Sequence, residues 1–149
     1  MNEAEVIKYI KQVLDGLQHM HEASVVHLDL KPENIMVETS RSTDIKLVDF
    51  GLASKLNPNE EVKVTTATAE FAAPEIAEFG SVGFYTDMWA VGVLAYVLLS
   101  GISPFAGDSD FETFENVKRA TYSFNHPQFS GISDKAKDFI SKLLKRNPK

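Results

Sequence analysis

Four polar side chains in the first third of the sequence have types and spacings that suit chemistry on a phosphate. Asp29, Lys31 and Asn34 lie close together in residues 27–34, and Asp49 follows two short apolar runs. An ionised aspartate can orient a hydroxyl group and accept its proton, whereas a lysine supplies a point cation. Carboxylate and amide oxygens are ligands that Mg²⁺ prefers. Taken singly, Asp49 would be a turn residue and Lys31 a solvated surface charge.

Three short motifs follow one another along the chain. The first is His27-Leu28-Asp29-Leu30-Lys31-Pro32-Glu33-Asn34, the second is Asp49-Phe50-Gly51 and the third is Ala73-Pro74-Glu75. All three at workable spacing would arise by chance well under one time in about 10⁶. On these motifs the chain resembles the protein kinase superfamily, in which they form the catalytic loop, the magnesium-binding motif and the end of the activation segment.

Further runs narrow the resemblance within that superfamily. They are Thr68-Ala69-Glu70-Phe71-Ala72-Ala73-Pro74-Glu75, Tyr85-Thr86-Asp87-Met88-Trp89 and Leu98-Leu99-Ser100-Gly101-Ile102-Ser103-Pro104-Phe105. With His27-Leu28-Asp29, they resemble the myosin light chain kinase group and the giant titin and twitchin muscle kinases. The resemblance covers essentially the whole chain. It implies a serine/threonine protein kinase.

The resemblance implies ATP and Mg²⁺ as cofactors and assigns roles to single residues. Phosphoryl transfer depends on placing a hydroxyl in line with the γ-phosphate and on neutralising the charge around it. Asp29 would accept the hydroxyl proton, Lys31 would face the moving phosphoryl group, and Thr68 would bond near both, a trait of serine/threonine kinases. The implied catalytic residues are Asp29, Lys31, Asn34 and Thr68, the cofactor-binding residues are Asp49, Asn34, Lys31 and Met36, and the metal ligands are Asp49 and Asn34.

The resemblance also implies two supporting roles. His27 would be a core prop rather than an acid or base, packed by Phe50, which we also expect in the core. Asp87 would bond the backbone of the catalytic loop from a buried position. Without the resemblance, Asp87 in front of an apolar helix would be read as an N-terminal cap.

Two positions depart from the pattern of the superfamily. Leu28 stands where an arginine usually grips a phosphate on the activation segment, and Ala67 stands where glycine is usual before Thr68. A leucine cannot bind phosphate. The resemblance to the muscle kinases therefore implies control by a tail that blocks the cleft, with a calmodulin-type regulator acting through a tail that lies beyond Lys149.

Composition excludes several other classes of function. The formal net charge of −6 argues against nucleic-acid binding, because such proteins concentrate Lys and Arg. The absence of cysteine excludes disulfides and thiolate metal sites. The first ten residues do not form a signal peptide, and the apolar run 88–99 is too short to cross a bilayer. We expect a cytoplasmic protein, sarcomeric or cytoskeletal by resemblance.

Periodicity predicts a mainly α fold with one short β-hairpin. Apolar residues recur at helical spacing near the N-terminus, behind a capping box formed by Asn2 and Glu5. The long stretch after the hairpin has no period and is expected to be a surface loop. The expected elements are helices at 3–22, 86–99, 111–119 and 133–145, strands at 35–37 and 45–48, and a loop at 51–70.

The resemblance identifies this pattern with the C-terminal lobe of the α+β kinase fold, with the N-terminal lobe absent. Its parts are the catalytic loop 27–34, the activation segment 49–75 and the substrate-lobe helices 86–149. Two functions remain open. The chain belongs either to an active serine/threonine kinase, inactive as residues 1–149 alone, or to a non-catalytic kinase-lobe module that binds protein partners.

Overall fold

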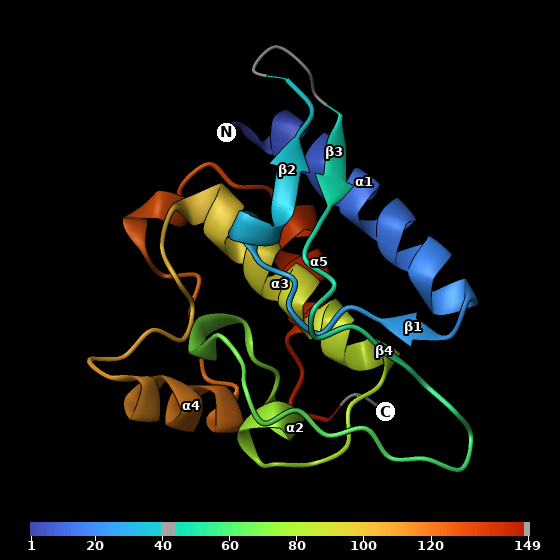
Figure 1. Ribbon diagram of the computed structural model, residues 1–149. Coiled ribbons are helices and arrows are strands. Elements are labelled where there is room, and N and C mark those ends of the chain that lie inside the picture. Colours follow the sequence, from blue (N-terminus) through green and yellow to red (C-terminus); the bar gives the residue numbers. More distant parts are fainter. Residues whose placement is uncertain (40–43, 148–149) are drawn as a thin grey trace.

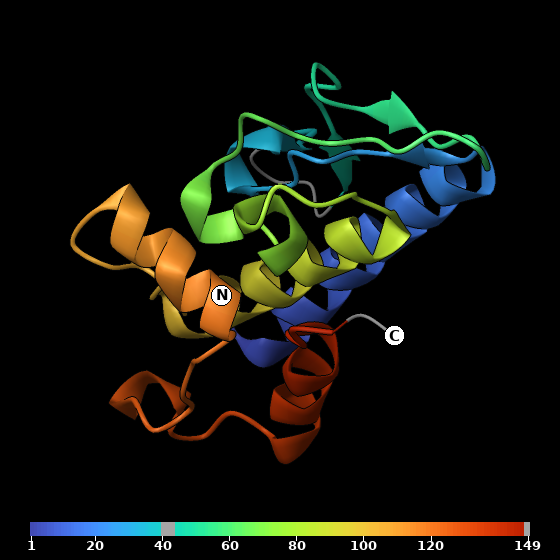
Figure 2. The ribbon, with the colours of Figure 1, turned by 90° about the horizontal axis from the view of Figure 1, so that it is seen from below.

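The computed structural model describes residues 1–39 and 44–147. The long helix α3 (Phe84–Ser100) lies at the centre, with α1 (Glu3–Glu22) and α5 (Asp134–Leu143) packed against it (Figure 1). The shorter helices α2 (Pro74–Ala77) and α4 (Asp110–Arg119) contact each other, and the view from below shows them apart from α5 (Figure 2). The mainly α expectation is confirmed.

Helix α1 has the bounds and the cap that its sequence predicts. Asn2 Oδ1 accepts from the Glu5 amide at 2.9 Å, and Glu5 Oε2 accepts from the Asn2 amide at 2.9 Å. This reciprocal pair satisfies two amides that a helix start leaves without partners. The helix buries one stripe of its side chains against α3. The stripe consists of Val6, Ile10, Val13 and Leu17.

The strands form two small antiparallel pairs. The predicted hairpin is confirmed to within one residue, since β2 (Ile35–Val37) pairs with β3 (Ile45–Leu47). Part of its turn, residues 40–43, lies outside the described residues. The second pair was not predicted. In it, β1 (Val25–Val26) pairs with β4 (Ser54–Lys55), and β4 lies inside the stretch 51–70 that was expected to be loop. Two-residue strands are too short to show a period of two.

Helix α3 is buried on nearly all sides, as its unbroken apolar run predicts, and begins two residues earlier than expected. A Cβ added at Gly92 would lie 2.8 Å from Leu144 Cδ2, so glycine permits the close approach of α5. Gly101, at φ 77°, ends the helix in the left-handed conformation. Aromatic rings extend this core beside α3, namely Tyr96, Phe105, Tyr122, Phe124 and Phe129.

The remaining elements are short. Helix α4 begins one residue before its predicted start, and α5 ends at Leu143 rather than at the predicted residue 145. The 3-10 turns η1 (Pro32–Asn34), η2 (Ala69–Phe71) and η3 (Pro127–Phe129) complete the order of elements. Residues 148–149, the last two of the predicted range 86–149, lie outside the described residues.

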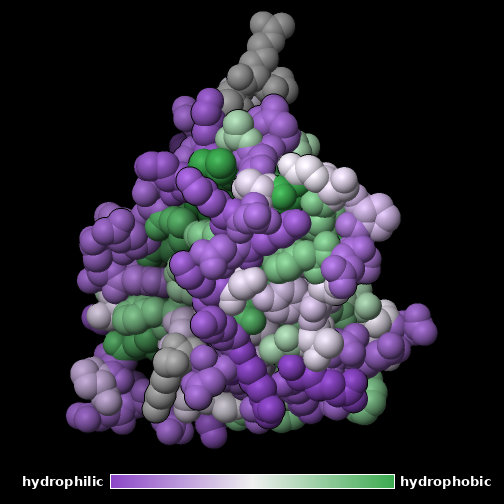
Figure 3. Space-filling view, turned by 180° about the vertical axis from the view of Figure 1, so that it is seen from behind, coloured by the Kyte–Doolittle hydropathy of each residue, from purple (hydrophilic) through white to green (hydrophobic). Residues whose placement is uncertain are grey.

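The surface mixes polar and apolar side chains. Figure 3, seen from behind, shows apolar patches between hydrophilic residues. In residues 1–39 and 44–147, no helix has both the length and the apolar character needed to cross a membrane.

Candidate active site

The loop between β1 and η1 is held by a carboxylate from α3. Asp87 Oδ2 accepts from the His27 amide at 2.8 Å, and Asp87 Oδ1 accepts from the Leu28 amide at 2.9 Å. The Asp87 side chain is 1% exposed. These bonds confirm the expected contact with the loop backbone. The alternative reading as a helix cap is wrong, because Gly83 occupies the N-cap position of α3.

Asp29 lies in a set of polar contacts that joins residues 29–34 to Thr68. Asn34 Nδ2 donates to the Asp29 carbonyl at 2.8 Å and to Asp29 Oδ2 at 3.0 Å. Lys31 Nζ lies 3.6 Å from Asp29 Oδ1 and donates to Thr68 Oγ1 at 2.8 Å. The side chains of Asp29 and Lys31 are 16% and 23% exposed, so solvent reaches both. The four predicted catalytic residues therefore lie together, although Thr68 comes from the far end of the activation segment.

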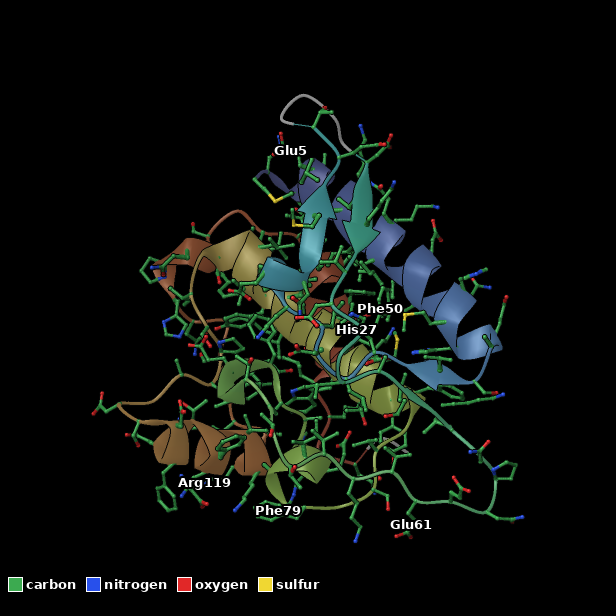
Figure 4. All side chains as sticks on the ribbon, viewed as in Figure 1. Glu5, His27, Phe50, Glu61, Phe79 and Arg119 are labelled. Atoms are coloured by element: carbon green, nitrogen blue, oxygen red, sulfur yellow. The ribbon has the colours of Figure 1, made fainter. Side chains whose placement is uncertain are left out.

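His27 is fully buried and braces the loop from inside. Its Nδ1 accepts from the Asp29 amide at 3.2 Å, so its Nε2 donates to the Val48 carbonyl at 3.0 Å. Both ring nitrogens are thus engaged by the backbone, which agrees with the expected role as a core prop. The Phe50 ring lies 5.4 Å from the His27 ring, and Figure 4 shows the two residues side by side. The expectation that Phe50 is a core residue is wrong, because it is 54% exposed.

The residue before Asp49 is hydrogen-bonded to Asn34 through the backbone. The Val48 amide donates to the Asn34 carbonyl at 2.9 Å, which fixes the start of the Asp49 turn. Asp49 itself is exposed, has a φ of 58° and accepts from the Gly51 amide at 3.3 Å. A non-glycine residue in this left-handed region is uncommon and often marks a functional site.

Met36 is the predicted adenine-site residue and lies on β2. It is 54% exposed, and Val37 beside it is 48% exposed. The two side chains point to opposite faces of the strand, since successive residues of a strand alternate. Within residues 1–39 and 44–147, no three His, Asp or Glu side chains come together as a metal site.

The stretch 49–75, predicted to be the activation segment, is held by an apolar cluster. Leu28 is 7% exposed and Val64 is 9% exposed, and both belong to this cluster. The Val82 amide donates to the Val62 carbonyl at 2.9 Å and ties the segment to the loop before α3. Leu28 thus packs against the segment. The buried residues of this cluster, called the Leu28 cluster below, are Val26, Leu28, Val64, Ala72, Ile76 and Val82.

Two polar contacts near the site were not predicted from the sequence. Thr86 Oγ1 donates to Glu75 Oε1 at 2.7 Å. Burial raises the pKa of the Glu75 carboxyl, and the Thr86 hydrogen bond offsets part of that rise. His21 Nε2 lies 2.8 Å from Asp87 Oδ2. No motif marks His21, so only its position in the last turn of α1 could have drawn notice.

Comparison with known proteins gives the same family as the motifs. The protein kinase domain family matches residues 1–149. The titin homolog of Caenorhabditis elegans is 51% identical over 144 residues, and the smooth-muscle myosin light chain kinase of Gallus gallus is 50% identical over 149 residues. The match covers 97% and 100% of this chain. It spans only 1% and 8% of those two relatives.

Solved structures agree with this comparison. The twitchin kinase region from C. elegans has a TM-score of 0.95 and 59% identity, over 99% of this chain and 26% of that one. The autoinhibited serine kinase domain of titin has a TM-score of 0.93 and 39% identity, over 99% of this chain and 46% of that one. The chain therefore belongs to the protein kinase family, in the group of the myosin light chain, titin and twitchin kinases.

Proposed function

We propose that the chain forms the C-terminal lobe of a serine/threonine protein kinase, which transfers a phosphoryl group from Mg-ATP to a protein hydroxyl. The observation that carries the proposal is the contact set around Asp29, in which Lys31 and Asn34 contact one solvent-accessible carboxylate and Thr68 accepts from Lys31. A domain used only for binding partners has no need to order these four side chains.

The geometry suits a positioned base. Asn34 bonds both the carbonyl and one carboxylate oxygen of Asp29 and so fixes the rotation of that side chain. The carboxylate can accept a hydrogen bond from a substrate hydroxyl and take its proton as the oxygen attacks phosphorus. Lys31 places a cation 3.6 Å from Asp29. Thr68 holds that ammonium where the equatorial oxygens of the phosphoryl group would develop charge.

The donor set also fits magnesium. Both bonds from Asn34 to Asp29 use the amide nitrogen, which leaves the amide oxygen directed elsewhere. Asp49 contributes an exposed carboxylate from the adjoining turn. Mg²⁺ in such sites takes one or two protein oxygens and completes its shell with phosphates and water. When bound, it would neutralise the charge of the ATP phosphates. We assign the metal to Asn34 and Asp49.

The exposed apolar residues beside this site suit the adenine and a second lobe. Met36 and Phe50 are each about half exposed, and exposed apolar surface of this kind marks a binding face. We assign Met36 to the floor of the adenine site. An N-terminal lobe would supply the glycine-rich loop and the lysine that hold the phosphates in kinases.

The names of the relatives suggest partners and control. The solved titin domain is described as autoinhibited and the twitchin fragment as autoregulated. We extend to this chain a protein substrate, control by a tail and a calmodulin-type regulator of that tail. We also infer a cytoplasmic, sarcomeric or cytoskeletal setting. Nucleic acid and membrane are not among the proposed partners.

The test is phosphate transfer by the longest open reading frame that contains residues 1–149. With γ-labelled ATP and a mixed peptide library, label should appear on serine and threonine and should require Mg²⁺. Residues 1–149 alone should bind Mg-ATP more weakly than about 1 mM and transfer nothing above background. A long form that binds protein partners but neither binds nor turns over ATP would contradict the kinase and identify a binding module.

A further inference from the structure

Asp87 joins three segments that are far apart along the chain. Its carboxylate accepts from the amides of His27 and Leu28, and His21 from the last turn of α1 contacts the same carboxylate. The distance from His21 Nε2 to Asp87 Oδ2 is 2.8 Å. The two side chains are 17% and 1% exposed. His21 is thus the side chain that accompanies two backbone amides on a buried carboxylate.

The orientation of the His21 ring is itself fixed. The Phe84 ring lies 4.7 Å from it at an interplanar angle of 39°. Phe84 begins α3, and Asp87 follows one turn later on the same helix. The first turn of α3 therefore supplies a ring contact and a hydrogen-bond partner to one imidazole. A side chain held from two directions loses little further entropy when it bonds the carboxylate.

The loop that Asp87 holds is strained. Leu28 has a φ of 66°, a conformation that costs a residue with a side chain of order 1–3 kcal/mol and persists only when its surroundings enforce it. His27 Nδ1 holds the peptide plane after Leu28 by accepting from the Asp29 amide at 3.2 Å. Asp87 holds the plane before Leu28 by binding the Leu28 and His27 amides. Those bonds need the carboxylate in one rotation. His21 and the His27 amide share Oδ2, which leaves Oδ1 facing Leu28.

We propose that His21 is a positioning residue for phosphoryl transfer, acting through Asp87 on the strained turn that places Asp29. Asp29 follows Leu28 directly, so a turn that relaxes would displace the reacting carboxylate. Displacements of about 1 Å can cost about 100-fold in rate. This inference rests on the proposed function. It differs from a packing role, because it requires the hydrogen bond and not merely the ring.

The test separates the bond from the ring with two variants of the longest reading frame. His21→Phe keeps a ring against Phe84 and removes the donor, whereas His21→Gln keeps an N–H donor and removes the ring. We expect His21→Phe to lower kcat about 10- to 100-fold while the peptide KM changes less than about twofold. His21→Gln should restore kcat to within about threefold of the wild type. His19→Phe, at an exposed position of the same helix turn, is the matched control and should change neither constant.

A second readout does not depend on activity. In His21→Phe, hydrogen exchange at the His27 and Leu28 amides should accelerate about 10-fold or more, while the Val13 amide in the core of α1 keeps its wild-type rate. Equal kcat values for the wild type and His21→Phe, or unchanged exchange at both amides, would overturn the proposal. A loss of kcat in His21→Gln equal to that in His21→Phe would also overturn it, because an N–H donor at this position would then fail to restore the rate.

The proposal can still be tested if His21→Phe does not fold or if the wild type transfers no phosphate. If His21→Phe does not fold, His21→Leu removes the donor to Asp87 with a smaller apolar side chain. It must then show the same kcat loss and amide exposure, and their absence overturns the proposal. If the wild type transfers no phosphate, the proposed kinase function fails separately, and the amide exchange of His27 and Leu28 still decides whether His21 holds the turn.

Discussion

The loop that carries Asp29 and the activation segment that faces it are held by opposite kinds of force. The loop is fixed by hydrogen bonds to the buried Asp87, whereas the segment is fixed by the Leu28 cluster. Hydrogen bonds are directional and define the placement of atoms, whereas apolar burial is non-directional. Leu28 belongs to both, because its amide bonds Asp87 and its side chain belongs to the same apolar cluster as Val64. Breaking each kind of contact should therefore have different consequences.

The largest expected effect on stability comes from breaking the polar contact. Asp87→Ala leaves two buried amides and His21 without their acceptor, and each unsatisfied group costs about 1–3 kcal/mol. We expect the free energy of unfolding to fall by about 3–5 kcal/mol in total, measured by urea denaturation. Asp15→Ala, which removes an exposed pair with Lys11, should cost less than about 1 kcal/mol. Equal losses in the two variants would remove Asp87 from its anchoring role.

Breaking the apolar contact should act on the segment more than on the loop. Leu28→Ala deletes a buried side chain and should cost about 2–3 kcal/mol in unfolding free energy. Because the cluster that buries Val64 loses a member, trypsin should cleave faster after Lys63. Leu52→Ala, at a half-buried position beside the cluster, should have a smaller effect on both quantities. A Leu28 variant with wild-type cleavage kinetics would show that the segment is held by other contacts.

The same difference predicts insensitivity to phosphorylation. Thr65 and Thr66 are exposed on the segment, and Leu28 offers no guanidinium to a phosphate placed there. Replacing both threonines by alanine in a tail-free form should therefore change kcat/KM by less than about threefold. Peptide kinetics on protein freed of phosphate would measure this. A strict requirement for phosphothreonine would mean that a cation elsewhere, such as Lys55 or Lys63, replaces the missing arginine.

The smallest expected effect concerns Glu75, whose pKa burial raises above its ordinary value of 4.5. The folded protein therefore holds the Glu75 proton more tightly than the unfolded chain does. Ionisation of Glu75 destabilises the fold as the pH rises above 4.5, and the loss is complete above the raised pKa. Below pH 4.5 this penalty is absent. Gln still accepts from Thr86 but does not ionise. Glu75→Gln in residues 1–149 should raise Tm by about 1–3 °C at pH 7 and leave it nearly unchanged at pH 4.

The control for that measurement is Glu38→Gln, which removes an exposed pair with Lys46 and should not raise Tm at either pH. A fall in Tm for Glu75→Gln at pH 7 would reveal a cation that pairs with Glu75.

Much of the frame of the molecule could be predicted because its signals are local. The capping box of Asn2 and Glu5, the apolar stripe of α1 and the unbroken apolar run of α3 each define an element within one segment. The partners of Asp87 among the backbone amides also followed from the motifs. Residues 27–34 and 49–51 thus identified both the family and the neighbourhood of the candidate site.

The features that escaped prediction all depend on contacts between distant segments. The β1–β4 pair has two residues in each strand, so no alternation announces it. Phe50 is apolar and short-range reasoning buries it, yet it contacts His27 from an exposed position. His21 reaches Asp87 across 66 positions of sequence, and its neighbour His19 has the same residue type without that contact. Geometry alone distinguishes the two histidines.

The central claim is that the ordered contacts around Asp29 serve phosphoryl transfer, and Asp29→Asn tests it most directly. Asparagine keeps the shape of the side chain and removes the charge that accepts the proton. In the longest reading frame, kcat for peptide phosphorylation should fall about 10²- to 10⁴-fold, while the peptide KM stays within about threefold of the wild type. A variant that keeps more than about a third of the wild-type kcat would contradict the assignment of Asp29 as the base.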